Sequence, residues 1–99
     1  MQELLDTLNN QKGVRINEDE VIELELDKWE LENAYYPKFV NTVLTGENAV
    51  LVLEKDIRTG NTRVSLTIGD QEDYYSTLVT YANIQVIKDT IYIALGEEV

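Results

Sequence analysis

The sequence predicts an α+β domain, in which a mainly antiparallel sheet of about five strands carries two or three short helices on one face. Three observations indicate this class. Residues 49–69 have the pattern of a β-hairpin, residues 84–95 have the pattern of a second one, and apolar side chains recur at helical spacing in residues 3–10, 37–45 and 71–82. An all-β meander is the alternative if residues 37–45 and 71–82 are extended.

The hairpin of residues 49–69 is the centre of the predicted sheet. Its first arm, residues 49–53, is apolar on both faces, whereas Val64, Leu66 and Ile68 of the second arm alternate with polar residues. The first arm is therefore expected in the middle of the sheet and the second nearer an edge. Gly60 lies in the connecting segment and tolerates the positive φ that such turns require.

Two elements are predicted before this hairpin. Leu4, Leu5 and Leu8 recur at helical spacing, so residues 3–10 are expected to form a short helix that rests on the sheet. In residues 20–27, Ile22, Leu24 and acidic side chains alternate, which favours a strand. A helix competes there, because Asn17 followed by Glu20 resembles a capping box.

The two helices predicted inside the chain rest on weaker patterns. Pro37 suits a helix start and Gly46 a helix end, but Asn41, Thr42 and Thr45 are poor helix formers, so a strand remains open for residues 37–45. For residues 71–82, the acidic stretch 70–73 would suit a helix N-terminus. The chain then closes with residues 84–87, a turn at 88–89 and residues 90–95.

Composition excludes several functions for this 99-residue chain, which we expect to be one domain over residues 1–99. Because the sequence has no cysteine and no histidine, it offers no thiol nucleophile and no imidazole base. Its five glycines are isolated and form no phosphate-binding loop, and no acidic stretch has EF-hand spacing. We therefore predict no enzymatic activity, no cofactor and no metal site.

The charge balance points to a protein partner. A net charge of −11 disfavours direct contact with nucleic acid or anionic lipid, both of which are held by lysine and arginine. The N-terminal end has no secretory signal pattern and no apolar run reaches the length of a membrane span, so a soluble cytoplasmic protein is expected.

The most acidic stretch suggests how such a partner would be recognised. Glu23, Glu25 and Asp27 would share one face of the predicted strand at a spacing of about 6.6 Å. Continued by Glu30 and Glu32, this row could imitate the phosphates of a nucleic acid strand. The alternative is a charged face that keeps the sheet soluble and discourages edge-to-edge aggregation.

Tyrosine provides the second part of the predicted surface, because it combines an apolar ring with a polar tip and is enriched at interfaces. The complete predicted partner-binding set combines these aromatic residues with the acidic ones: Glu18, Asp19, Glu20, Glu23, Glu25, Asp27, Trp29, Glu30, Glu32, Tyr35, Tyr36, Asp70, Glu72, Asp73 and Tyr74.

The predicted function is an acidic protein-binding module that inhibits or regulates a basic, nucleic-acid-handling protein by imitating nucleic acid. In size and acidity the chain resembles phage and mobile-element inhibitors of restriction and CRISPR systems. The alternatives are a homo-oligomeric structural or accessory subunit without catalytic activity, and a carboxylate-rich binder of cations or small ligands.

Overall fold

The structure, a computed structural model, describes the backbone of residues 1–99 and all side chains except those of Glu72, Asp73 and Tyr74. In this described backbone one helix is followed by nine strands. Their bounds are α1 Gln2–Asn9, β1 Val14–Ile16, β2 Ile22–Glu25, β3 Glu30–Tyr35, β4 Phe39–Thr45, β5 Ala49–Asp56, β6 Thr62–Ile68, β7 Gln71–Val79, β8 Ala82–Ile87 and β9 Thr90–Leu95.

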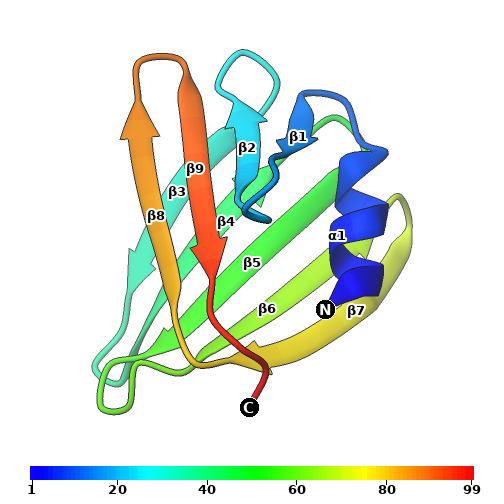
Figure 1. Cartoon of the computed structure of the whole chain (residues 1–99). Helices are drawn as coiled ribbons and strands as arrows, with labels where there is room; N and C mark the ends of the chain where they lie inside the picture. The colour runs from blue at the N-terminus through cyan, green and yellow to red at the C-terminus, as the bar shows by residue number, and fades with distance from the viewer.

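The strands form two antiparallel sheets that lie one in front of the other (Figure 1). One sheet has the order β1-β2-β9-β8, and the other is a meander in the order β3-β4-β5-β6-β7. Helix α1 covers the side of the molecule where β1 and β7 form neighbouring edges (Figure 1). The predicted antiparallel sheet is thus confirmed in type, but the chain forms two sheets and one helix, so the all-β alternative fits better.

The central hairpin is confirmed. Strand β5 lies in the middle of the meander and β6 one place from its edge, with Leu51 opposite Leu66 and Leu53 opposite Val64. These four side chains are buried against the other sheet. Gly60 has a φ of +81°, so the connecting segment uses the left-handed conformation that glycine permits.

The predicted helices at residues 37–45 and 71–82 are wrong, because these residues form β4 and β7. In β4, Thr42 and Leu44 are buried while Val43 between them is only partly buried, which is the two-residue period of a strand. In β7, Thr77 and Val79 alternate in the same way. The helical spacing of apolar residues in both stretches is a coincidence of short windows, and their β-branched residues favour the extended form.

The acidic stretch at residues 70–73 is not a helix N-terminus. Gly69, with a φ of +55°, and Asp70 form the two-residue turn between β6 and β7, and β7 starts at Gln71. A glycine at a positive φ followed by a polar residue suits a tight hairpin connection.

The core joins both sheets and the helix. The predicted N-terminal helix is confirmed as α1, and Leu4, Leu5 and Leu8 are buried in one cluster with Leu24 of β2 and Leu51 of β5. The final hairpin is confirmed as β8 and β9. In the described part of the chain, no helix is long and apolar enough to cross a membrane.

Candidate functional site

The predicted acidic row is divided between the two sheets. Glu23 and Glu25 lie on the outward face of β2, because Ile22 and Leu24 point to the core. The strand ends at Glu25 and the chain turns, so Asp27 lies in the turn and not on the strand.

The remaining part of the predicted row lies elsewhere. Glu30 and Glu32 lie on β3, which is an edge strand of the five-stranded meander, and both side chains are exposed. Because Leu31 between them packs on the core, the two carboxylates face away from the other sheet. The acidic residues of β2 and β3 therefore point to opposite sides of the molecule and do not form one ladder.

Trp29 is not part of any surface, contrary to the prediction. Its side chain is 1% exposed, and its indole nitrogen Nε1 donates a hydrogen bond of 2.9 Å to the carbonyl oxygen of Lys12. A tryptophan at the start of an edge strand is buried here because the segment before β1 closes over it.

Two of the predicted tyrosines lie on β3 or directly after it, and not in the β1–β2 loop that carries Asp19 and Glu20. Tyr35 and Tyr36 are 75% and 47% exposed at the end of β3, where the Tyr36 ring stacks on that of Phe39. Asp70 is exposed in the β6–β7 turn. The side chains of the remaining predicted residues, Glu72, Asp73 and Tyr74, lie outside the described part of the structure.

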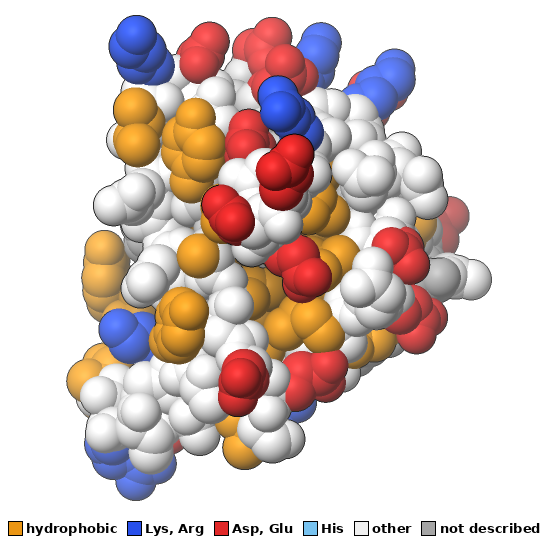
Figure 2. Space-filling view, viewed as in Figure 1, with side chains coloured by type: hydrophobic (Ala, Val, Ile, Leu, Met, Phe, Trp, Pro, Cys, Tyr) orange, Lys and Arg blue, Asp and Glu red, His pale blue; other side chains and the backbone are white. Residues whose placement is uncertain are grey.

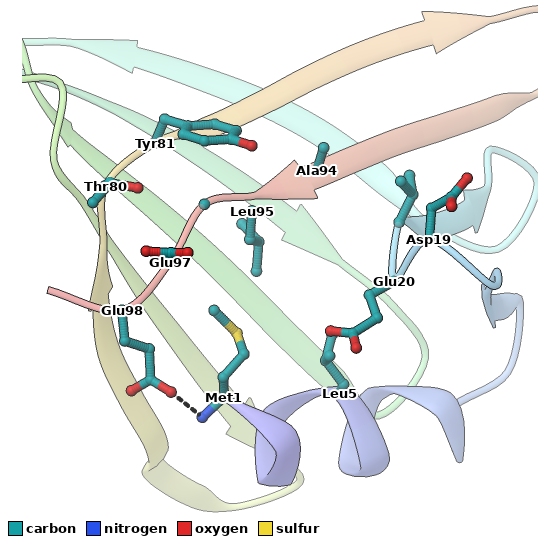
Figure 3. A pocket seen from close by; sticks show the side chains of 12 residues that line it. Met1, Leu5, Asp19, Glu20, Thr80, Tyr81, Ala94, Leu95, Glu97 and Glu98 are labelled. Carbon is teal, nitrogen blue, oxygen red and sulfur yellow. Dashed lines mark ion pairs between the residues drawn. The ribbon is translucent and has the colours of Figure 1, made fainter.

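The most developed hollow lies where four distant segments meet, and we call it the acidic pocket. It has a volume of about 680 Å³ and is bordered by the start of α1, the β1–β2 loop, the β7–β8 connection and the end of β9. Figure 3 shows Glu97 and Glu98 on one side, Asp19 and Glu20 on the other, and α1 between them. The complete lining is Met1, Leu5, Asp19, Glu20, Val21, Thr80, Tyr81, Ala94, Leu95, Gly96, Glu97 and Glu98.

Asn17 positions the two carboxylates of the β1–β2 loop. Its side-chain oxygen Oδ1 accepts hydrogen bonds from the backbone N–H groups of Asp19 at 2.9 Å and Val21 at 3.1 Å. The loop is further constrained at Glu20, whose φ of 61° is uncommon for a residue other than glycine. The loop is thus held in one conformation by a side chain that forms an Asx turn.

Tyr81 forms the aromatic wall of the acidic pocket. Its carbonyl oxygen accepts a hydrogen bond of 2.9 Å from the N–H of Gly96 on the neighbouring chain segment. A Cβ added to Gly96 would lie 2.5 Å from Cδ2 of Tyr81, so the ring occupies the space that a side chain at residue 96 would need. The absence of a side chain at Gly96 therefore leaves the space in which the Tyr81 ring lies.

Glu98 joins the C-terminal segment to the start of the chain. Its Oε1 lies 2.7 Å from the amine of Met1, and its Oε2 accepts a hydrogen bond of 2.8 Å from the Thr77 hydroxyl. The amine and the hydroxyl hold the pKa of the Glu98 carboxyl below its ordinary value. In turn, Glu98 and the Tyr75 hydroxyl raise the pKa of the Met1 amine.

The other carboxylates of the acidic pocket are available to a ligand. Among the described side chains, those of Asp19, Glu20 and Glu97 have neither an ion pair nor a side-chain hydrogen bond, and no lysine or arginine lines the pocket. Figure 2 shows carboxylates around apolar side chains at the centre of this face. Most lysine and arginine side chains in this view lie at the top and the lower left of the molecule.

The sequence pointed to only two residues of this site. It selected Asp19 and Glu20 but missed Tyr81, Glu97 and Glu98, although the acidic excess of residues 67–99 was a signal for the last two. Among the described side chains, no group of three or more Asp or Glu residues has the arrangement that a metal ion requires.

The chain matches no protein-family model, and searches of the curated proteins and of the solved structures found no match. A function must therefore be inferred from the chemistry of the surface itself.

Proposed function

We propose that the protein is an acidic protein-binding module that regulates a basic, nucleic-acid-handling partner. The observation that carries this proposal is the acidic pocket, where Asp19, Glu20 and Glu97 have no ion-pair partner among the described side chains and border a partly apolar hollow lined by no lysine or arginine. The acidic residues of β2 and β3 cannot contact one groove together, because they face different sides of the molecule. The site of contact is the pocket instead.

The lining of the acidic pocket suits the side chain of a lysine or arginine. Such a side chain places its aliphatic stem on apolar surface and its charged head near carboxylates. Ala94 and Leu95 offer the apolar surface, and Asp19, Glu20 and Glu97 offer the acceptors. An arginine head could also lie against the Tyr81 ring, where the face of the π-system attracts a cation.

The charge of the whole chain supports the same class of partner. A net charge of −11 accelerates encounter with a basic surface and repels nucleic acid. Proteins that bind nucleic acid carry basic surfaces, since lysine and arginine neutralise the phosphates that they contact. A module that occupies such a groove would compete with nucleic acid for it.

The first test uses a hexa-arginine peptide as the probe and nuclear magnetic resonance as the readout. We expect shifts of the backbone amides of Asp19, Glu97 and Tyr81, and weaker binding at high salt because exposed charge contacts are screened. The double variant Asp19→Asn/Glu97→Gln should raise the dissociation constant roughly tenfold, which corresponds to a loss of about 1.4 kcal/mol of binding free energy.

The matched control removes two charges elsewhere. Glu30→Gln/Glu32→Gln makes the same change in net charge on an exposed strand of the other sheet, so it should bind the peptide almost as tightly as the wild type. Equal losses in the two variants would show that the probe responds to net charge alone and would contradict a site at the pocket.

The second test asks whether the partner handles nucleic acid. The chain is immobilised and incubated with a nuclease-treated lysate of its native host, and captured proteins are then challenged with double-stranded DNA. We expect a basic protein that is released by the DNA and is not captured by Asp19→Asn/Glu97→Gln. Capture that DNA does not reverse would contradict competition for a nucleic acid groove.

A further inference from the structure

Strand β8 is the least protected of the four sheet edges in the described backbone. Strand β1 has three residues and lies beside α1, β7 is bridged to the C-terminal segment at Val79 and Glu98, and β3 carries Glu30 and Glu32. Strand β8, by contrast, has six residues, Ala-Asn-Ile-Gln-Val-Ile, with neither a charge nor a proline. It therefore lacks the devices by which proteins block edge-to-edge pairing.

The geometry of the β8–β9 hairpin identifies the backbone groups that remain unpaired. Residue pairs in an antiparallel ladder exchange hydrogen bonds at every second position. The Gly96 N–H bonds to the Tyr81 carbonyl oxygen, which makes the odd-numbered residues of this strand the ones that bond to β9. The N–H and C=O groups of Ala82, Ile84 and Val86 consequently point to the open edge, where no described group bonds to them.

Apolar side chains accompany this unpaired edge. Val86 and Ile87 are 53% and 52% exposed, and as consecutive residues of a strand they lie on its opposite faces. A strand that presents unsatisfied backbone groups and exposed β-branched residues is a template for another strand.

We infer that two copies of this chain associate through β8, which pairs antiparallel with β8 of the second copy about a two-fold axis at Gln85. In this register Ile84 of each copy lies opposite Val86 of the other and exchanges backbone hydrogen bonds with it. The two Gln85 amides meet at the axis, where they can bond to each other, and the two four-stranded sheets become one continuous sheet.

Charge selects a second copy as the occupant of this edge. Two chains of net charge −11 repel each other over most of their surface. The β8 edge is uncharged along its whole length, so two copies can approach there without placing carboxylates opposite carboxylates. A basic partner gains no charge contact from this edge, which separates this surface from the acidic pocket.

The test compares variants at Val86 by light scattering coupled to size-exclusion chromatography. Val86→Pro removes an N–H that β9 does not use, so the hairpin should stay intact while pairing is lost. Val86→Thr keeps the N–H and the branched side chain and serves as the matched control. We expect wild type and Val86→Thr to dimerise and Val86→Pro to have a dissociation constant at least about tenfold higher.

Salt gives a second signature of this interface. Dimerisation should strengthen with NaCl because screening weakens the repulsion between the copies, whereas binding of a basic peptide at the pocket should weaken. In the wild-type dimer, hydrogen exchange should slow at the amides of Ile84 and Val86, which point to the open edge. In Val86→Pro, which has no amide hydrogen at residue 86, the Ile84 amide should exchange rapidly while the circular dichroism spectrum stays native.

Two results would overturn the inference. The first is a wild-type monomer at about 1 mM protein and roughly 0.5 M NaCl, conditions that favour the dimer. The second is a Val86→Pro dimer as tight as that of the wild type. If Val86→Pro does not fold, Val86→Lys places a charge on the same edge, and an unimpaired Val86→Lys dimer would count equally against pairing through β8.

Discussion

At the residue scale, the indole ring of Trp29 fills the space that a side chain at position 46 would need, and Gly46 leaves that space free. A Cβ built on Gly46 would be 2.7 Å from Cζ2 of Trp29, and the buried indole has little room to move. We predict that Gly46→Ala destabilises the fold by about 1–3 kcal/mol, the usual range for overpacking. The midpoint of urea unfolding measures the change.

A double-mutant cycle distinguishes this clash from other effects of Gly46→Ala. Trp29→Phe removes the ring atoms nearest to residue 46, together with the indole N–H that bonds to Lys12. The single variant Trp29→Phe should be destabilised itself, but Gly46→Ala should cost less in that background than in the wild type. An identical cost in both backgrounds would show that the indole is not the obstacle.

At the element scale, the sequence predicted those strands in which apolar residues form a continuous run or alternate clearly with polar ones. Strands β5 and β6 alternate clearly because one face of each is buried, and Gly60 marks their connection. Strands β4 and β7 were mistaken for helices, since they are half-exposed, and their polar residues obscure the two-residue period. Their identity depends on pairing with β5 and β6, which a local pattern does not reveal.

The link between α1 and the C-terminal segment is a second feature of the element scale, and it leads to a pH prediction. Glu98 contacts both the Met1 amine and the Thr77 hydroxyl of β7. Because its pKa is lowered by folding, its contribution to stability is present above the ordinary carboxyl pKa of about 4.3 and is lost as pH falls through the folded value.

The amine shows the opposite dependence. Its pKa is raised in the folded chain, so its contribution is complete below the ordinary value of about 7.7–8.0 and is lost as pH rises through the folded value. We predict that Glu98→Gln makes the melting temperature depend less on pH, both in the acidic range where the carboxyl titrates and in the alkaline range where the amine titrates. Thermal melts of wild type and variant between acidic and alkaline pH test it, and parallel profiles would contradict the prediction.

At the scale of the whole molecule, the acidic pocket illustrates what a sequence pattern cannot provide. Asp19 and Glu97 lie in distant parts of the chain and share a pocket only because β2 and β9 are neighbours in one sheet. The acidic row on residues 23–32 looked continuous in the sequence, yet the turn after Glu25 sends its second half to the other sheet. Residues that are close in the chain lie on different surfaces wherever the chain passes from one sheet to the other.

The charge distribution gives the last prediction, a rise of the melting temperature with salt. A net charge of −11 destabilises a compact chain through self-repulsion, and NaCl screens this repulsion. The described side chains form three ion pairs, of which those at Lys12 and Arg58 are exposed, so screening removes little that is favourable. Calorimetry of Val86→Pro, in which we expect dimerisation to be lost, measures the effect of charge on the fold.

Screening has two properties that make this prediction specific. Its effect should level off above roughly 0.3 M salt, where the Debye length is shorter than most distances between surface carboxylates, and it should not depend on the anion. The charge-reduced variant Glu30→Gln/Glu32→Gln should start from a higher melting temperature and respond less to salt, because less repulsion remains to be screened. A melting temperature that falls with NaCl would instead mean that the ion pair of Met1 with Glu98 outweighs the repulsion among the remaining carboxylates.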